Sequence, residues 1–468
     1  MTGALLGAAG VGAVRGSRAA AAVAADAVPL ARRLADYIVG IRLQNLPPAA
    51  IERAKEELLY HVGLAFTGAK TAAGRQALEI ARTLSRGCPG PSTIIGAHGR
   101  YGALEAAFAN ASFIRALGLD DVLFPSATHA GLLTYPAALA IAEQQHSRGD
   151  ELLVAVIAAY EILGKLVIDE APGRAPHRPS MPFGPFAGAT ATARLLRLPA
   201  SRTAEAIGYA ADSAMGLKEG NEQQPTHIYG LIARHAIMAA LLARAGGETA
   251  PTILEGKYGF YATLIGRQPN ADDIVRRLGK DLEILRVTQK RFPGTAMNVV
   301  PIELMLDLVN REHLTAREVS RIEFELPEDR STFEDSISTG PYPSRTQAES
   351  SLPFQTAIIL LDGHIDLARY DHPNDPQVLA VTHRVIIRLR PHANTRFARV
   401  VVTTREGRRF ERQGDSYAFP PLDALAWVER DGDSFVPRAS LERFVAGVHR
   451  LEQLEDVSPL LQLLSAEP

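Results

Sequence analysis

Apolar residues in the first 265 positions recur at the three-to-four-residue spacing of amphipathic helices. Leu30, Leu34 and Ile38 mark one such face, and Pro47-Pro48 opens a second helix, because proline is favoured in a first helical turn. The same spacing predicts further helices over 101–117, 136–145, 151–169, a segment that Ser201 can cap, and 229–245. This block shows no convincing alternation of period two, so we predict that it is all-α.

The pattern changes after residue 275. Apolar and polar residues alternate over 322–326, 385–389 and 400–402, and Glu406-Gly407 can turn the chain back on itself. Alternation of this kind predicts strands and a hairpin. Helical spacing over 299–309 and 355–361 lies between them. Residues 275–420 are therefore predicted to form a separate α+β domain.

The chain returns to helical spacing after Pro420-Pro421, and we expect this segment to pack back on the first block. The predicted fold is mainly α with an α+β second domain: a large all-helical domain built from both chain ends, plus a smaller α+β lid. Its predicted parts are 28–274 for the first part of the helical domain, 275–420 for the lid and 421–468 for the returning segment. Residues 1–27, rich in Ala and Gly, are predicted to be a disordered tail.

Composition excludes several classes of protein. The 468 residues are 46% hydrophobic and 22% charged, as in ordinary globular proteins of several domains. A net charge of −2 offers no basic excess for nucleic acid, and no run of 18 apolar residues predicts a membrane span. The single cysteine, Cys88, can form neither an internal disulfide nor a Cys-based zinc site. We expect a cytoplasmic protein that binds a small molecule.

The sequence contains none of the standard phosphate-loop, nucleophile-elbow or zinc-helix motifs. Its 13 histidines are scattered, without a pair at metal-ligand spacing. We therefore expect neither a metal nor a nucleotide cofactor.

Candidate chemistry lies in four Gly/Pro-rich loops between apolar helices, where sites are often built on a rigid scaffold. The loops cover 119–131, 176–186, 221–228 and 289–295. Their polar residues are Asp120, Asp121, Thr128 and His129; His177, Arg178 and Ser180; Gln224 and His227; and Lys290 and Arg291.

In this order, the loops resemble the MmgE/PrpD family over about residues 28–465. The matching residues are Asp120, Asp121, Thr128, His129, Gly131 and 136–143 in the first loop and its helix; His177, Pro179 and Ser180 in the second; Lys290 to Pro293 in the fourth; and the runs 351–355 and 360–363.

The resemblance implies a cofactor-free and metal-free site between the two domains of a homodimer. The implied chemistry removes a proton or a carboxylate next to an activated carbon. It points to His177 as the proton-transfer residue, with His129 and Lys290 binding the substrate and stabilising charge. The remaining implied substrate-binding positions are Asp120, Asp121, Thr128, Arg178, Ser180, Gln224, His227, Arg291, Thr295 and Phe354.

Four positions depart from the family pattern. Gly118, Gln224, Thr295 and Phe354 stand where the resemblance implies an aspartate, a lysine, a histidine and a tyrosine. Lys218 could compensate for Gln224. The losses predict a substrate that is larger or less charged than a tricarboxylate.

Three functions stay open. The first is a lyase that dehydrates or decarboxylates an organic acid. The second is an isomerase, epimerase or cyclase of a specialised-metabolite pathway, and the third is a non-catalytic family member.

Overall fold

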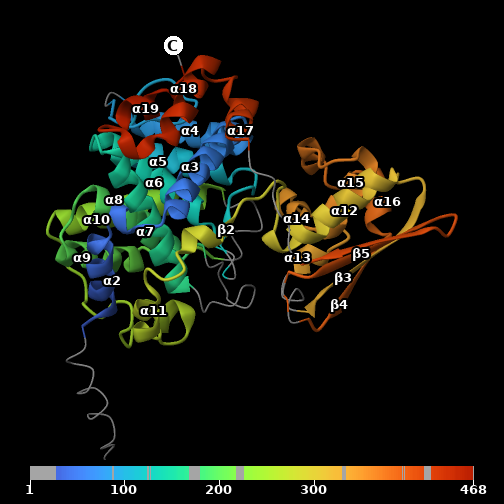
Figure 1. The fold of residues 1–468 in the computed structure, drawn as a ribbon, viewed down its shortest axis with the longest axis horizontal. Coiled ribbons are helices and arrows are strands. Elements are labelled where there is room, and N and C mark those ends of the chain that lie inside the picture. The colour runs from blue at the N-terminus through green and yellow to red at the C-terminus, as the bar shows by residue number, and fades with distance from the viewer. Residues whose placement is uncertain are drawn as a thin grey trace, which may run out of the picture.

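The computed structural model describes residues 28–86, 89–123, 126, 128–167, 180–217, 226–328, 334–392, 394, 396–415 and 423–466. Helices pack on one another throughout the first domain (Figure 1). They are α2 (Leu30–Gly40), α3 (Pro48–Ala69), α4 (Ala72–Leu84), α5 (Ala103–Arg115), α6 (Ala130–Gln144), α7 (Gly149–Val167), α8 (Gly184–Leu195), α9 (Ala200–Asp212), α10 (Thr226–Arg244) and α11 (Ala271–Arg277).

The centre of this domain is formed by α6, α7 and α8, which are buried on nearly all sides. Small residues let these helices approach closely. A Cβ added at Gly188 on α8, for example, would lie 2.6 Å from the Cβ of Ala236 on α10. A helix that is apolar all round has to be buried, which explains why these segments are so rich in Ala and Leu.

Two short strands join the first domain to the segment that leads out of it. β1 (Val122–Leu123) pairs antiparallel with β2 (Val287–Thr288), with Val122 opposite Thr288. The prediction that the first block is all-α is wrong at this point, because a two-residue strand is too short to produce an alternating pattern. The pairing holds the first loop beside the fourth.

The second domain is built on a four-stranded sheet of order β4–β3–β5–β6. β3 (Val319–Pro327) is parallel to β4 (Val385–Arg390) and antiparallel to β5 (Ala398–Thr404), which pairs with β6 (Arg409–Gly414). Its helices are α12 (Val299–Glu312), α13 (Glu334–Ile337), α14 (Arg345–Ser350), α15 (Leu352–Asp362) and α16 (Pro376–Thr382). These elements enclose a hydrophobic core separate from that of the helical domain.

The end of the chain returns to the first domain. α17 (Ala424–Gly432), α18 (Arg438–His449) and α19 (Ser458–Gln462) lie beside the N-terminal helices in Figure 1, and both α17 and α18 contact α3. The indole of Trp427 stacks on Tyr60 with ring centroids 5.3 Å apart, and its Nε1 donates to the Tyr60 carbonyl. The predicted class, mainly α with an α+β second domain, is confirmed.

Two helix starts differ from the sequence predictions. α6 begins at Ala130 and carries Pro136 inside it, whereas the sequence predicted a start at Pro136. α9 is preceded by Pro199, so Ser201 lies within the helix and does not cap it. In addition, His227 lies in the first turn of α10 and not before it. Proline favours a first helical turn but does not require one, which is why the start of α6 was misplaced.

α10 is long and apolar enough to cross a membrane by length and composition alone. In the fold it packs against α5, α8 and α9, and just over half of its apolar window is buried. We therefore interpret it as a core helix of the first domain.

Candidate active site

A buried group of charged residues forms where the first loop meets the segment that leads to the second domain. Arg115, at the end of α5, donates from Nη1 to Asp120 Oδ1 over 2.7 Å. The other oxygen of Asp120, Oδ2, lies 2.5 Å from Nδ1 of His129. The Arg115 guanidinium also lies 5.2 Å from the ring centroid of Tyr229 on α10. A short loop and two helix ends thus bring an arginine, an aspartate and a histidine together.

The surroundings of His129 determine which ring nitrogen carries the proton. Nδ1 lies between two acceptors, the Asp120 carboxylate and the Asp121 carbonyl at 2.8 Å. A carbonyl can only accept, so Nδ1 carries the hydrogen. Within the described part of the chain, Nε2 has no hydrogen-bond partner, and the side chain keeps 16% of its surface exposed. A neutral His129 therefore presents the lone pair of Nε2 as a base.

Lys290 is the buried cation of the fourth loop. Its Nζ donates to the carbonyls of Gly118, at 2.7 Å, and of Gly294, at 3.2 Å. The Lys290 backbone is held in turn by Tyr60, whose Oη accepts from Lys290 N at 2.9 Å and lies 2.7 Å from the Lys290 carbonyl. The same hydroxyl contacts the Leu119 carbonyl. Tyr60 of α3 therefore connects the first loop to the fourth.

The pKa values of these groups follow from burial and from one another. Burial alone would raise the pKa of Asp120, but the charges of Arg115 and Lys290 hold it well below its usual range. Burial lowers the pKa of His129 below its usual value despite the Asp120 charge. Burial also lowers the pKa of Lys290 to about 8. Near neutral pH the cluster thus holds an anion, a neutral imidazole and an ammonium group that can release its proton.

The second domain adds a further carboxylate. Glu349, at the end of α14, is buried and forms an ion pair with Arg345 at 2.7 Å. Burial raises its pKa, against the charges of Arg345, Arg115 and Lys290. Gly118 has a positive φ of 63°, and a Cβ there would lie 3.3 Å from Glu349 Oε2. An aspartate at position 118 would therefore bring a second carboxylate beside Glu349.

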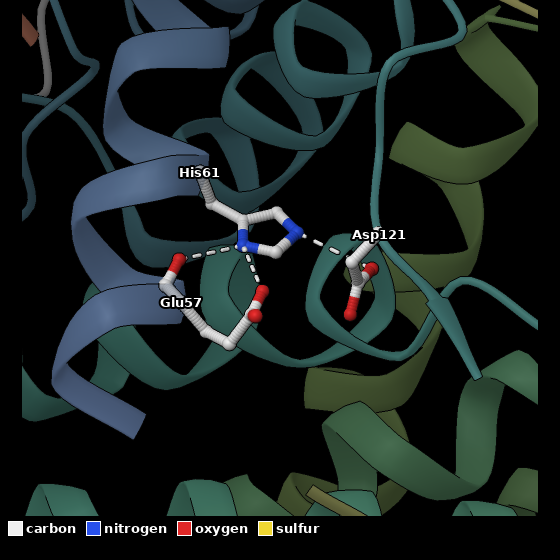
Figure 2. Close-up of side chains that lie close together, drawn as sticks. All are labelled: Glu57, His61 and Asp121. Carbon is white, nitrogen blue, oxygen red and sulfur yellow. Dashed lines mark hydrogen bonds and ion pairs between the residues drawn. The ribbon is translucent and has the colours of Figure 1, made fainter. Parts of the chain in front are cut away.

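Behind this cluster, Asp121 belongs to a second buried network, which Figure 2 shows. His61 on α3 lies 3.3 Å from Asp121 Oδ1 through Nε2, and 2.7 Å from the Glu57 carbonyl through Nδ1. Both oxygens of Asp121 accept from Gly131 N at 3.0 Å, and Tyr160 donates to Oδ2 at 3.1 Å. Asp121 thereby satisfies a free N–H in the first turn of α6.

Among the described residues, Glu57, His61 and Asp121 also form a group whose side chains could together ligate a metal ion. Each offers one ligand atom, and these atoms all lie within 4.8 Å of one another. The sequence predicted no such group, because Asp121 lies 60 residues from His61 in the chain. Most of these atoms already have hydrogen-bond partners within the protein. The exception is Glu57 Oε2, which lies 3.7 Å from His61 Nδ1 and has no hydrogen-bond partner among the described residues.

The other predicted site residues are spread over several environments. Ser180 accepts from His129 N at 3.1 Å, and Thr128 contacts Ser126 at 2.8 Å, so both support the first loop. Thr295 follows Gly294, next to the Lys290 bond, and is half-buried. Arg291 lies 3.8 Å from Glu303 on α12.

Two predicted residues lie elsewhere. Phe354 is fully buried in the second core, where its ring contacts Tyr342 and Tyr370. His227 pairs with Gln76 of α4 at 3.2 Å and stacks on Phe108. No contact among the described residues links either one directly to the His129 cluster. The predictions for His177, Arg178, Gln224 and Lys218 lie outside the described residues.

Sequence reasoning missed four residues of the two networks: Arg115, Glu349, Glu57 and His61. Arg115, Glu57 and His61 lie within predicted helices, where a polar residue resembles the solvated face of an ordinary helix, and Glu349 lies between the predicted elements. A signal existed for His61 alone, since it lies inside an apolar run, Leu58 to Phe66, where a histidine needs a buried partner.

Comparisons with known proteins agree with this architecture. The MmgE/PrpD N-terminal domain matches residues 32–272, and the MmgE/PrpD C-terminal domain matches residues 292–425. A cis-aconitate decarboxylase of Homo sapiens is 26% identical over 463 residues, which cover 92% of this chain and 93% of that protein. A cis-aconitate decarboxylase of Aspergillus terreus is 27% identical over 285 residues, 57% of each chain. A cis-aconitate decarboxylase-like protein of Aspergillus oryzae is 29% identical over 278 residues, 55% of this chain and 57% of that one. With both family domains present in order over most of its length, the chain belongs to the MmgE/PrpD family.

Proposed function

We propose that this chain is a cofactor-independent lyase that abstracts a proton from an organic acid and leads it to dehydration or decarboxylation. The relatives named decarboxylases support a lyase-type reaction. The observation that carries the proposal is the fixed tautomer of His129, whose Nε2 is left free beside a buried ammonium group. A base with a tuned pKa and a preorganised cation are what such chemistry needs.

His129 acts as the base, and Lys290 and Arg115 stabilise charge. In a dehydration, Nε2 of His129 takes the proton next to the substrate carboxylate. The electron pair of that C–H bond forms the new double bond as hydroxide leaves with a proton. In a decarboxylation, the carboxylate departs as carbon dioxide, and a proton is returned to the carbon. Lys290 and Arg115 stabilise the negative charge that develops in either case. His177, which the sequence assigned to proton transfer, remains a second candidate for the acid or base.

The charges of the cluster favour an acid with few carboxylates. Arg115 is already paired with Asp120, and Glu349 places a second carboxylate near Lys290 and Arg115. These two carboxylates offset much of the positive charge that a tricarboxylate would need. We therefore propose a substrate that is larger or less charged than a tricarboxylate.

The experiment follows mass and hydrogen exchange together. Purified protein is incubated in D₂O with cis-aconitate, 2-methylcitrate and a panel of unsaturated and hydroxylated mono- and dicarboxylic acids. Loss of water or carbon dioxide from one of the less charged acids is the expected result. Products without a change in composition, but with deuterium incorporated, would favour the isomerase, epimerase or cyclase alternative, which the same base can serve. Saturable binding without turnover would favour a non-catalytic protein.

Variants then test the assignment of the base. His129→Gln should lower turnover by about 100-fold or more, because a positioned base contributes at least that much. His177→Ala tests the second candidate in the same assay. His146→Asn is the matched control, since His146 forms an exposed pair with Asp456. If His129→Gln keeps activity within a few fold of the control, His129 is not the base.

A further inference from the structure

His61 lies among residues that fix both of its ring nitrogens. The groups that face the ring are Glu57 and Tyr60 on its own helix, Tyr135 on α6 and Asp121 in the first loop. Tyr160 of α7 approaches the Asp121 carboxylate from the other side. The His61 side chain is 1% exposed, and those of Glu57 and Asp121 are fully buried. Water therefore does not supply the partners of this imidazole.

The hydrogen-bond pattern leaves little freedom for the protons. Nδ1 faces the Glu57 backbone carbonyl at 2.7 Å, and a carbonyl can only accept, so Nδ1 is protonated. Nε2 faces Asp121 Oδ1 at 3.3 Å. That carboxylate already accepts from a backbone N–H and a tyrosine hydroxyl, as an ionised carboxylate does. An unprotonated Nε2 would set a lone pair against this anion, so Nε2 carries a proton as well.

The charges of the network agree with this arrangement. Burial raises the pKa of Glu57 to about 8, so this side chain is protonated and neutral at neutral pH. The remaining imidazolium and carboxylate then form one neutral pair. Burial alone would lower the pKa of His61, but the Asp121 charge and the Glu57 backbone carbonyl raise it above its usual value. A buried ion pair with all of its hydrogen bonds made is tolerable, whereas either ion alone would not be.

We propose that His61 is held as an imidazolium by Asp121 and that the two are positioning residues that orient His129. Asp121 connects the two sites because its side chain and its backbone carbonyl contact different residues. Its carboxylate holds His61 and the first turn of α6, and its carbonyl accepts from Nδ1 of His129. His129 is the residue immediately before α6. Rotation of Asp121 would thus withdraw one of the two acceptors of His129 Nδ1 and leave the Asp120 carboxylate as the other.

The inference rests on the proposed function only in naming His129 as a base, and its test needs no substrate. Protein labelled with ¹⁵N-histidine is examined by two-bond ¹H–¹⁵N correlation NMR, which reports the protonation of each ring nitrogen. Signals are assigned by difference from His61→Gln and His129→Gln. We expect His61 to be protonated at both nitrogens at neutral pH, and His129 at Nδ1 alone. A singly protonated His61 in the wild-type protein would overturn the proposal.

Two variants separate positioning from folding. Asp121→Asn should remove one ring proton from His61 and shift the Nδ1 resonance of His129, whose tautomer the Asp120 carboxylate still favours. Glu57→Gln keeps the backbone carbonyl and should change neither histidine, because Glu57 is already neutral. A His129 Nδ1 resonance that is unchanged in Asp121→Asn, or a His61 proton lost in Glu57→Gln, would contradict the proposal. If Asp121→Asn does not fold, the protonation of His61 in the wild-type protein and in Glu57→Gln still tests the proposal.

The matched control is again His146→Asn, which removes a histidine–aspartate pair from the surface and should leave the signals of His61 and His129 unchanged. Metal content is measured on the same samples. One equivalent of a divalent metal that is lost in His61→Gln would overturn the proposal, because a metal would then occupy the place of the proton. Failure of the proposed lyase activity, with His61 doubly protonated, would leave the positioning role intact.

Discussion

Gly131 shows how tightly single residues are constrained around His61. A Cβ at this position would lie 2.1 Å from Cε1 of His61 and 2.5 Å from the Tyr160 hydroxyl. Real Cβ atoms do not approach so closely, and both neighbours are buried and hydrogen-bonded. The glycine of the first loop is therefore required by packing against the network.

Gly131→Ala should destabilise the protein by about 1–3 kcal/mol, the usual cost of forcing extra volume into a packed core. Urea unfolding, followed by circular dichroism, measures the change. Gly99→Ala is not a suitable control because Gly99 has a positive φ, but Gly40 has no neighbour within 4 Å and an ordinary φ. Gly40→Ala should leave stability nearly unchanged, and an equal loss in both variants would refute the argument.

Lys290 gives the protein a specific dependence of stability on pH. Its folded pKa of about 8 lies below the ordinary value of 10.5, so between these values the unfolded chain binds more protons than the folded one. The free energy of unfolding should therefore rise with pH across this window, by about 3 kcal/mol for a shift of this size. Below pH 8 the full cost of the buried charge is present.

The test compares the wild-type protein with Lys290→Met at pH 8 and pH 10.5, so that other titrating groups cancel. The rise should be absent from the variant. Lys280→Met, at an exposed lysine, is the control and should follow the wild-type protein. Parallel pH profiles for wild type and Lys290→Met would contradict a depressed pKa at Lys290.

At the scale of elements, α17 supports the site through α3. Trp427 stacks on Tyr60, and Tyr60 holds both the Leu119 and Lys290 backbones. Through Tyr60, α17 thereby supports two loops that precede it in the chain by more than 100 residues. This contact explains why the returning segment belongs to the helical domain and not to the lid.

Trp427→Ala should cost about 2–4 kcal/mol, less than a fully buried tryptophan because Trp427 is half-buried. Trp427→Phe keeps a stacking ring and loses the Nε1 bond, so about 1 kcal/mol is expected. Thermal unfolding by circular dichroism ranks the two variants. Equal losses would mean that the ring stack on Tyr60 contributes nothing. Since Trp427 is the single tryptophan, the wild-type fluorescence reports directly on α17.

At the scale of the whole molecule, the homodimer implied by the family resemblance remains a proposal. The first domain exposes large apolar side chains on two neighbouring helices. They are Ile80 and Leu84 on α4, and Leu231, Met238 and Leu242 on α10. The three α10 residues fall on one face of the helix, as their spacing of seven and four requires. This surface is where we would place the second copy.

Light scattering should give about twice the 50.4 kDa chain mass. Leu231→Asp combined with Met238→Asp should shift the protein to monomers, because two carboxylates in an apolar interface would be desolvated without partners. Leu285→Asp is the control, since Leu285 is equally exposed but lies outside α4 and α10. A dimer that survives the double substitution would exclude this surface.

Hydrophobic periodicity was enough to divide the chain into a helical domain and an α+β domain, because burial of one face leaves a period of 3.6 or 2 in each element. The sequence also identified the loops that carry Asp120, His129 and Lys290. Only the tertiary structure joined them to Arg115, His61, Glu57 and Glu349. The bond from Lys290 to Gly118 spans 172 residues, and that from His61 to Asp121 spans 60. Local periodicity records which side of an element is buried, but not which distant residue lies opposite. The polar partners of a buried site depend on that second fact, so they were visible only once the helices were packed.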